Sequence, residues 1–154
     1  MLKTTRTYVA HITNHQQVCD ELNKCGFSAS KLWNVARYYT EQRWDDCGEI
    51  PDESELKSEL KTHERYNDLH CHSSQRVLEE LAEAFNGWYN SDDGNNPPGF
   101  RKCDDKHPRS TVTWKKGAIK HDDKHGQLRL SKGSNLKQGW SDFILAEYET
   151  RPDV

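Results

Sequence analysis

Apolar residues recur along this chain with two different spacings. At the beginning, Tyr8, Ala10 and Ile12 stand at every second position and so share one face, and this period of two predicts a β-strand within residues 5–13. From residue 14 to residue 90 the spacing is that of amphipathic helices. After residue 100 short alternating segments return. The pattern therefore predicts a strand, then helices, then further strands.

The first helix is expected to begin at Asn14 and to end at Gly26. Asn14 is a favourable N-cap residue, and Gln17 stands three residues later, which is the spacing of a capping box. Glycine is a common residue just beyond the end of a helix, so Gly26 is expected to separate this helix from the next. The second helix then runs from about residue 28 to about Trp44.

Two further helices are expected before residue 90. A short one begins at Pro51 and Asp52. The clearest helix of the chain begins at Ser73 and ends near Trp88. It has an apolar face, made by residues at helical spacing, namely Leu78, Leu81, Phe85 and Trp88. The turn-rich segment 90–99 then ends the helical part.

Short strands are expected after residue 100, within segments 110–114, 118–123, 127–131 and 143–150. The second and third of these are expected to form a hairpin, since the turn between them ends in Gly126. A lone N-terminal strand needs a partner, which only these segments can supply. We therefore expect an α+β fold, in which a helical bundle is inserted after the first strand of a β-barrel or curled sheet. The parts are a first strand at 1–13, helices at 14–90, a linker at 91–99 and the remaining strands at 100–154.

Charge divides the chain at the same place as the apolar pattern. Residues 14–98 hold 8 Lys and Arg against 17 Asp and Glu, a net charge of −9. Residues 99–139 hold 11 Lys and Arg against 4 Asp and Glu, a net charge of +7, and this basic part of the chain carries Phe100 and Trp114, with Trp140 directly after it. Basic strands that carry aromatic side chains are suited to phosphates and unstacked bases. The second half of the chain therefore indicates nucleic-acid binding.

The composition is polar for a chain of 154 residues, with 32% hydrophobic and 31% charged residues and a mean hydropathy of −1.10. We therefore expect the chain to be marginally stable alone, or to pack against something that it does not carry. No apolar run reaches the roughly 18 residues of a membrane span, and no signal-peptide pattern is found, so a cytoplasmic protein without a membrane partner is expected. The cysteines have irregular spacing and imply no disulfide framework.

Four segments in collinear order carry recognisable motifs: MLKTTRTYVAHIT (1–13), SASKLWNVARYY (28–39), SSQRVLEELAEAFNGWYN (73–90) and PPGFRK (97–102). The basic stretch from residue 110 to residue 130 follows them. Together they resemble the N-terminal part of the TnpB family, the OrfB proteins of insertion sequences, which are relatives of the type V CRISPR effectors. The family's usual Arg-Leu-Tyr-Pro after the first strand is His-Ile-Thr-Asn here, at residues 11–14.

The resemblance implies an incomplete oligonucleotide-binding-type β-barrel, the wedge domain, with an inserted helical recognition bundle. It implies binding to a guide RNA scaffold and to double-stranded DNA next to the target. The family's RuvC-like nuclease domain and its zinc insert have no counterpart in these residues. We therefore expect a nucleic-acid-binding fragment of a transposon-encoded RNA-guided endonuclease, or transposase, that is not catalytic on its own and uses no cofactor. An incomplete barrel is also expected to self-associate through its open edge.

Some candidate site residues come from the resemblance. Gln75 aligns with a helix-start glutamine that faces the duplex motif, and Lys115 and Lys116 align with hairpin positions near it. The amide of Gln75 is able to read an adenine edge, although a solvated helix-start glutamine has the same pattern. A duplex-contacting tyrosine of the family aligns near Glu53, whose carboxylate does not suit that contact.

Other candidates come from the strand pattern itself. Cations at alternating strand positions share a face, which extends the predicted phosphate-binding surface to Lys120, Arg129 and Lys132. Arg101 and Lys102 are added for their charge. The alternative is that these cations form the solvated polar face of a sheet.

Other kinds of functional site have weaker support in the sequence. Three residues of segment 70–72 (His-Cys-His) suggest zinc, but adjacent residues cannot all converge on one tetrahedral ion, even with His63 upstream. The Asp doublets lie in turn-like segments and are expected to be solvated. Trp114 either stacks on a base or packs in the core. The alternative function, from another class, is an interaction or regulatory module whose acidic helices bind a partner protein.

Overall fold

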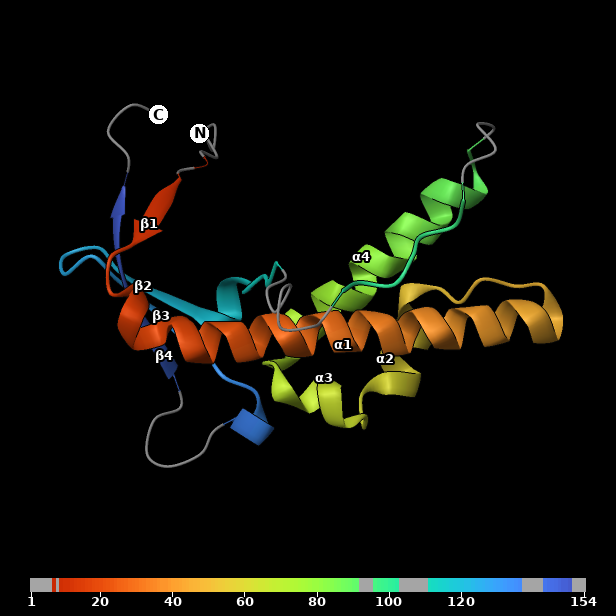
Figure 1. The fold of residues 1–154 in the computed structure, drawn as a ribbon, viewed down its shortest axis with the longest axis horizontal. Coiled ribbons are helices and arrows are strands. Elements are labelled where there is room, and N and C mark those ends of the chain that lie inside the picture. Colours follow the sequence, from red (N-terminus) through yellow and green to blue (C-terminus); the bar gives the residue numbers. More distant parts are fainter. Residues whose placement is uncertain (1–6, 8, 92–95, 103–110, 137–142, 151–154) are drawn as a thin grey trace, which may run out of the picture.

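In the computed structural model, a small sheet lies at one end of a long helical part (Figure 1). The structure describes residues 7, 9–91, 96–102, 111–136 and 143–150. The helices are α1 (His15–Cys47), α2 (Glu53–Leu60), α3 (Glu64–Asp68) and α4 (Cys71–Tyr89), with the 3₁₀ turns η1 (Lys116–Ala118) and η2 (Ser134–Leu136). The strands are β1 (Ala10–Ile12), β2 (Ile119–Asp122), β3 (Gln127–Ser131) and β4 (Phe143–Thr150). The expected α+β fold is confirmed.

The four strands form an open antiparallel sheet in the order β1-β4-β3-β2. The expected hairpin is confirmed, because β2 pairs with β3 from Ile119 opposite Leu130 to Asp122 opposite Gln127, and Gly126 has φ +61° in the turn. The N-terminal strand also finds its expected partner after residue 100, since β1 pairs with β4. The residues that the structure describes form this open sheet and do not show a barrel.

The expected break at Gly26 is wrong, because α1 is one continuous helix of 33 residues. Gly26 lies inside it and is buried, as are its small neighbours Cys25 and Ser28. An internal glycine costs a helix about 1 kcal/mol relative to alanine, but tertiary packing outweighs such a propensity. Ser28 Oγ donates to Asp68 Oδ2 of α3 at 2.9 Å. The small residues therefore mark the place where α1 packs against α3, and not a helix end.

Asn14 precedes α1 as expected, but the predicted capping box is wrong. The Asn14 side chain makes no capping hydrogen bond with α1. Instead its Nδ2 donates to the Leu145 carbonyl at 2.9 Å, and its Oδ1 accepts from Glu147 N at 2.8 Å. Both partners lie on β4. Asn14 therefore extends the pairing of β1 with β4 and fixes the start of α1 on the sheet.

The strand expected at 110–114 is wrong for residues 111–114, which form no strand, and Ser110 lies outside the described residues. The reason is visible at Trp114, whose Nε1 donates to the Ser131 carbonyl at the end of β3 (2.9 Å). A side-chain hydrogen bond thus connects this segment to β3, in place of backbone pairing between strands. The Trp114 ring is half-buried and packs against the core, which favours the core role over base stacking.

One core joins the helices to the sheet. Its fully buried residues include Leu32 of α1, Leu78 and Leu81 of α4, and Ile144 of β4, each exposed by 1% or less. The predicted apolar face of α4 is therefore confirmed. Among the described residues, no helix combines the length and the apolar character needed to cross a membrane.

Candidate nucleic-acid interface

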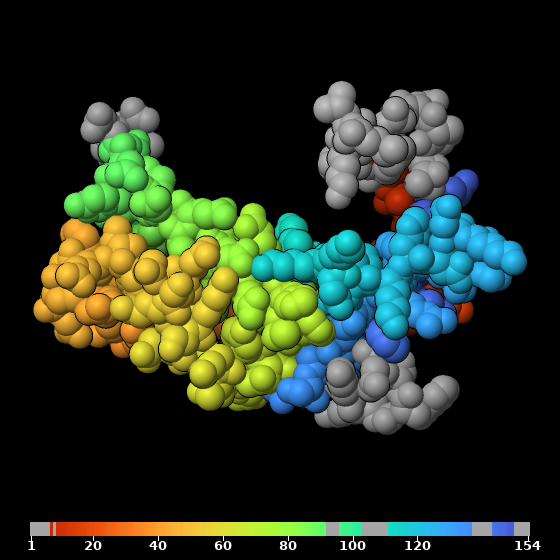
Figure 2. Space-filling view, turned by 180° about the vertical axis from the view of Figure 1, so that it is seen from behind, coloured from red at the N-terminus to blue at the C-terminus, as the bar shows by residue number. Residues whose placement is uncertain are grey.

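The start of α4 lies beside η1, although the two are far apart in the sequence. Gly117 approaches α4 so closely that a Cβ on it would lie 2.8 Å from His72 Cε1, and Lys115 Nζ is 2.8 Å from Glu79 Oε1. Figure 2 shows this segment against the start of α4, between the helices and the sheet. Because residues three, four and seven apart share a helix face, the half-buried Gln75 lies on the face that carries both contacts. The structure thus brings the predicted base reader and the predicted basic segment to one joint.

Three of the predicted cations are exposed beyond this joint: Lys116 in η1, Lys120 in β2 and Arg129 in β3. Lys120 and Arg129 stand directly opposite each other in the β2–β3 register. Within the described part of the chain, none of the three forms an ion pair. Like charges opposite each other across two strands repel, so an anion bound between them would relieve that repulsion. We name these three residues the cationic patch.

Carboxylates limit the cationic patch on one side. Strand alternation places Asp122 and Glu147 on the sheet face of Lys120 and Arg129, one row closer to the hairpin turn. A hydrogen bond from the His125 side chain holds the pKa of Asp122 below its usual value, so Asp122 carries a negative charge at neutral pH. The basic part of the sheet is therefore the end next to η1.

Arg101 and Lys102 have different surroundings. The Arg101 guanidinium lies 4.0 Å from the centre of the Trp33 ring and 3.4 Å from Glu80. The Asn34 side chain accepts from Arg101 N at 2.7 Å and donates to its carbonyl at 2.9 Å. Arg101 therefore holds the segment 96–102 on α1 and α4. Lys102 is exposed and is accessible to a phosphate.

Lys132 does not belong to an exposed surface, contrary to its predicted role. Its side chain is 7% exposed, and its Nζ forms an ion pair with Glu21 of α1. Its backbone also bridges to Leu69, between α3 and α4. A buried and paired ammonium cannot reach a phosphate without losing this partner. Lys132 therefore joins the sheet to the helices.

Lys115 is only partly accessible, because it contributes to an ion-pair cluster around Glu79. The Oε1 of Glu79 lies 2.8 Å from Lys115 Nζ and 3.0 Å from Lys57 Nζ, while its Oε2 lies 3.4 Å from Arg76. Burial opposes the ionisation of Glu79, but the hydrogen bonds from Lys115 and Lys57 outweigh it and lower its pKa to about 2. Since this carboxylate neutralises part of its charge, Lys115 is a weaker candidate for a phosphate ligand than Lys116.

Two of the histidines that suggested a zinc site act instead as N-caps of helices. His70 Nδ1 accepts from His72 N at the start of α4 (3.2 Å), and His63 Nδ1 accepts from Arg65 N at the start of α3 (3.1 Å). In the part of the chain that the structure describes, no group of three or more metal-ligating side chains is found. Histidine is not among the preferred N-cap residues, so the sequence carried no clear signal for this role.

Sequence reasoning missed a cleft at the other end of the helical part. Trp44 near the end of α1 and Tyr89 at the end of α4 both line it. Their only sequence signal is that large aromatic residues occur near helix ends. Whether they meet depends on how α1 and α4 cross.

No protein-family model, no curated protein and no solved structure matches this chain. The function is therefore inferred from the residues and their geometry.

Proposed function

We propose that this chain binds nucleic acid, as the recognition part of a TnpB-type, transposon-encoded RNA-guided endonuclease. The observation that supports this best is the joint between α4 and η1. There a side chain able to read bases, Gln75, shares a helix face with the contacts to the basic segment, and the cationic patch continues from that segment. Specific recognition of nucleic acid uses both kinds of contact, since phosphate contacts position a protein and base contacts give specificity.

The contacts between the motifs give a second support. Trp33 Nε1 donates to the Gly99 carbonyl at 2.9 Å, and Asn34 bonds both backbone groups of Arg101. Two of the segments that resemble the family, 28–39 and 97–102, therefore hold each other in place. A role for the Trp-Asn pair in positioning the segment after α4 explains why both motifs occur in one chain.

In this proposal Lys102 and the cationic patch bind phosphates of a guide RNA scaffold or of the target-adjacent duplex. The Gln75 amide donates and accepts in one plane, which matches N6 and N7 of an adenine in the major groove. The open sheet is part of an oligonucleotide-binding-type barrel that further strands complete. Strand cleavage belongs to a RuvC-like domain, so this chain alone cleaves neither DNA nor RNA.

The first test measures how binding depends on salt. Binding of a fluorescent double-stranded DNA, and of a hairpin RNA, is followed at increasing NaCl for the natural chain and for the triple variant K116A/K120A/R129A. Each lost phosphate contact is expected to flatten the slope of log K against log salt by roughly one unit. Lys61→Ala is the matched control, because Lys61 is an exposed lysine on the acidic helices. An unchanged slope in the triple variant would overturn the phosphate-binding role of the patch.

The same material tests Gln75 in a different way. The natural chain and Gln75→Ala each select duplexes from a pool with randomised sequence. Losing a bidentate base contact is expected to remove about 1–3 kcal/mol of preference at one position while the salt slope stays nearly constant. If both proteins select the same sequences, Gln75 is a solvated helix residue and does not read bases.

A further inference from the structure

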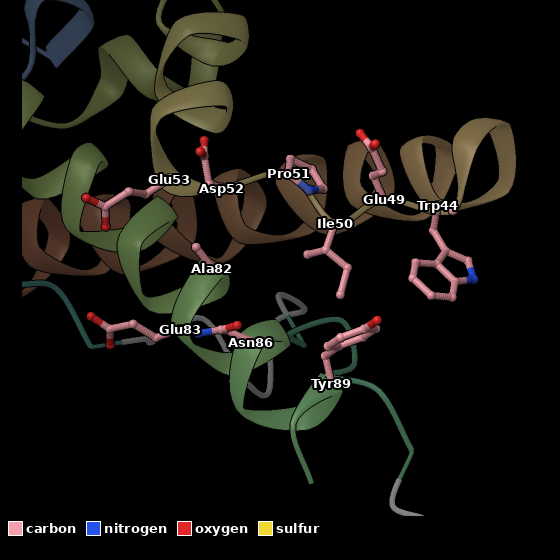
Figure 3. A pocket seen from close by; sticks show the side chains of 11 residues that line it. Trp44, Glu49, Ile50, Pro51, Asp52, Glu53, Ala82, Glu83, Asn86 and Tyr89 are labelled. Carbon is pink, nitrogen blue, oxygen red and sulfur yellow. The ribbon is translucent and has the colours of Figure 1, made fainter.

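The cleft between the ends of α1 and α4 is lined in part by apolar and aromatic side chains. Its volume is about 600 Å³, which is within the range of about 300–1,000 Å³ found for ligand sites. The Trp44 side chain is 41% exposed and Tyr89 is 62% exposed, with their ring centres 6.4 Å apart. Figure 3 shows Ile50 pointing toward the space between these two rings. Two large aromatic side chains are thus held together and remain open to solvent.

Carboxylate residues share the lining of this cleft with the two aromatic residues. The lining holds four acidic residues and, among the described residues, no lysine or arginine: Glu49, Asp52, Glu53 and Glu83. The cations nearest to them are shared with other carboxylates. Arg43 lies 3.5 Å from Glu49 but makes its closer contacts, at 3.0 and 3.1 Å, with Glu55. Arg76 lies 3.1 Å from Glu83 and also pairs with Glu79 and Glu80, each at 3.4 Å. The cleft therefore keeps an excess of negative charge.

This combination matches the chemistry of a long cationic side chain. The methylene stem of an arginine or lysine packs on apolar surface, here Ile50 and Ala82, while its charged head stays near solvent. The head is attracted to the faces of Trp and Tyr rings, and neighbouring cations of the same segment pair with the carboxylates of the lining. A phosphate or a nucleic-acid strand would be repelled from the same place.

We propose that this cleft is a docking site for a basic peptide segment of a partner protein, with one arginine or lysine side chain against the exposed surface of Trp44 and Tyr89. The site lies on the acidic helices, away from the cationic patch on the sheet. The protein therefore has two ends of opposite charge, one for nucleic acid and one for a protein. The failure of either proposal leaves the other intact.

The test uses the whole chain labelled with ¹⁵N-tryptophan and a hexa-arginine peptide at near-physiological salt. The indole signal of Trp44, assigned with Trp44→Phe, is expected to shift on titration. A hexa-citrulline peptide has nearly the same shape without the charge, and it is expected to leave the signal in place. The triple variant K116A/K120A/R129A is expected to bind the peptide as the natural chain does.

Variants at the cleft complete the test. Tyr89→Ala, at an exposed side chain, is expected to weaken binding about two- to five-fold, which corresponds to the 0.5–1 kcal/mol typical of exposed cation–π contacts. Glu83→Gln, also exposed, removes an ion pair and is expected to weaken binding about two- to five-fold. Glu59→Gln, an exposed carboxylate of α2 outside the cleft, is the matched control and is expected to change binding less than two-fold. Equal losses in all three variants, or no shift of Trp44, would overturn the site and leave only diffuse attraction by the acidic helices. Self-association of the chain without peptide, abolished by Tyr89→Ala, would instead assign the cleft to a second copy.

Discussion

Glu79 shows how much one side chain in this protein depends on partners from other elements. Its carboxylate lies within ion-pair distance of Lys57 in α2, Arg76 in its own helix and Lys115 before η1. Its side chain is 15% exposed, so the paired charge lies mostly out of water. A carboxylate in this position stabilises the fold only while it is ionised.

Replacing Glu79 by Gln is expected to lower the free energy of unfolding at pH 7 by about 1–2 kcal/mol, because three cations lose their shared partner. The pKa of this group falls from 4.5 to about 2 on folding, so its contribution is fully present above pH 4.5 and is lost as the pH falls toward 2. Urea unfolding of both proteins between pH 7 and pH 2 should therefore show a difference that shrinks below pH 4.5. Glu59→Gln should change the stability by less than about 0.5 kcal/mol throughout. A difference that stays constant down to pH 2 would contradict this account.

Among the secondary-structure elements, the turn between β3 and η2 makes a close approach to α3. A Cβ on Gly133 would lie 2.4 Å from both the backbone carbon and the carbonyl oxygen of Asp68. Backbone atoms cannot move aside as the end of a flexible side chain can. This contact, with the Asn135 side chain donating to Asp68 Oδ1 (2.9 Å), fixes the sheet against the helices.

Gly133→Ala is therefore expected to lower the free energy of unfolding by about 1–3 kcal/mol, as other overpacking changes do. Gly87→Ala is the matched control, since Gly87 lies on the exposed side of α4 and a Cβ there meets nothing within 4 Å. That change is expected to stabilise the protein by about 0.5–1 kcal/mol, because alanine is the better helix former. Thermal and urea unfolding give both values. If both substitutions changed the free energy of unfolding in the same direction, the turn would be able to move away from α3, and the close approach would not be rigid.

Over the whole molecule, the two charge regions partly neutralise each other. Arg101 pairs with Glu80, Lys115 with Glu79 and Lys132 with Glu21, and each pair joins the basic segment to the acidic helices. The charge asymmetry of the chain is therefore in part a complementarity between its two halves. Among the described residues of the basic segment, the cations that remain open are Lys102 and those on η1 and the hairpin.

A double-mutant cycle on Lys132 and Glu21 tests this view. Lys132→Met is expected to lower the free energy of unfolding by about 1–3 kcal/mol, because it leaves Glu21 without its partner. Adding Glu21→Gln should restore part of the loss, with a coupling of about 1–2 kcal/mol in urea unfolding. Lys120→Met, at an exposed lysine, should stay within about 0.5 kcal/mol of the natural chain. Additive effects of the two changes would mean that the pair does not link the two halves.

Local patterns of the amino-acid sequence by themselves determined much of the architecture. Some elements can be recognised from their own residues alone, because helical and strand periods and turn chemistry act over a few positions. These are the apolar repeat of α4, the turn before Gly126, and the strands β3 and β4. The pairing of β1 with a strand after residue 100 also followed, since no other partner was available. The charge division between residues 14–98 and 99–139 was equally plain.

Only the tertiary structure decided what depends on residues distant in the sequence. Gly26 continues a helix because α1 is packed there, and Asn14 leaves its capping role because β4 offers it backbone partners. Lys120 and Lys132 are indistinguishable as members of a basic segment, yet one is exposed and the other is buried against Glu21. Burial and charge pairing are set by which surfaces meet, and the local period carries no information about that. The same reason hid the cleft, which exists only because the ends of α1 and α4 lie side by side.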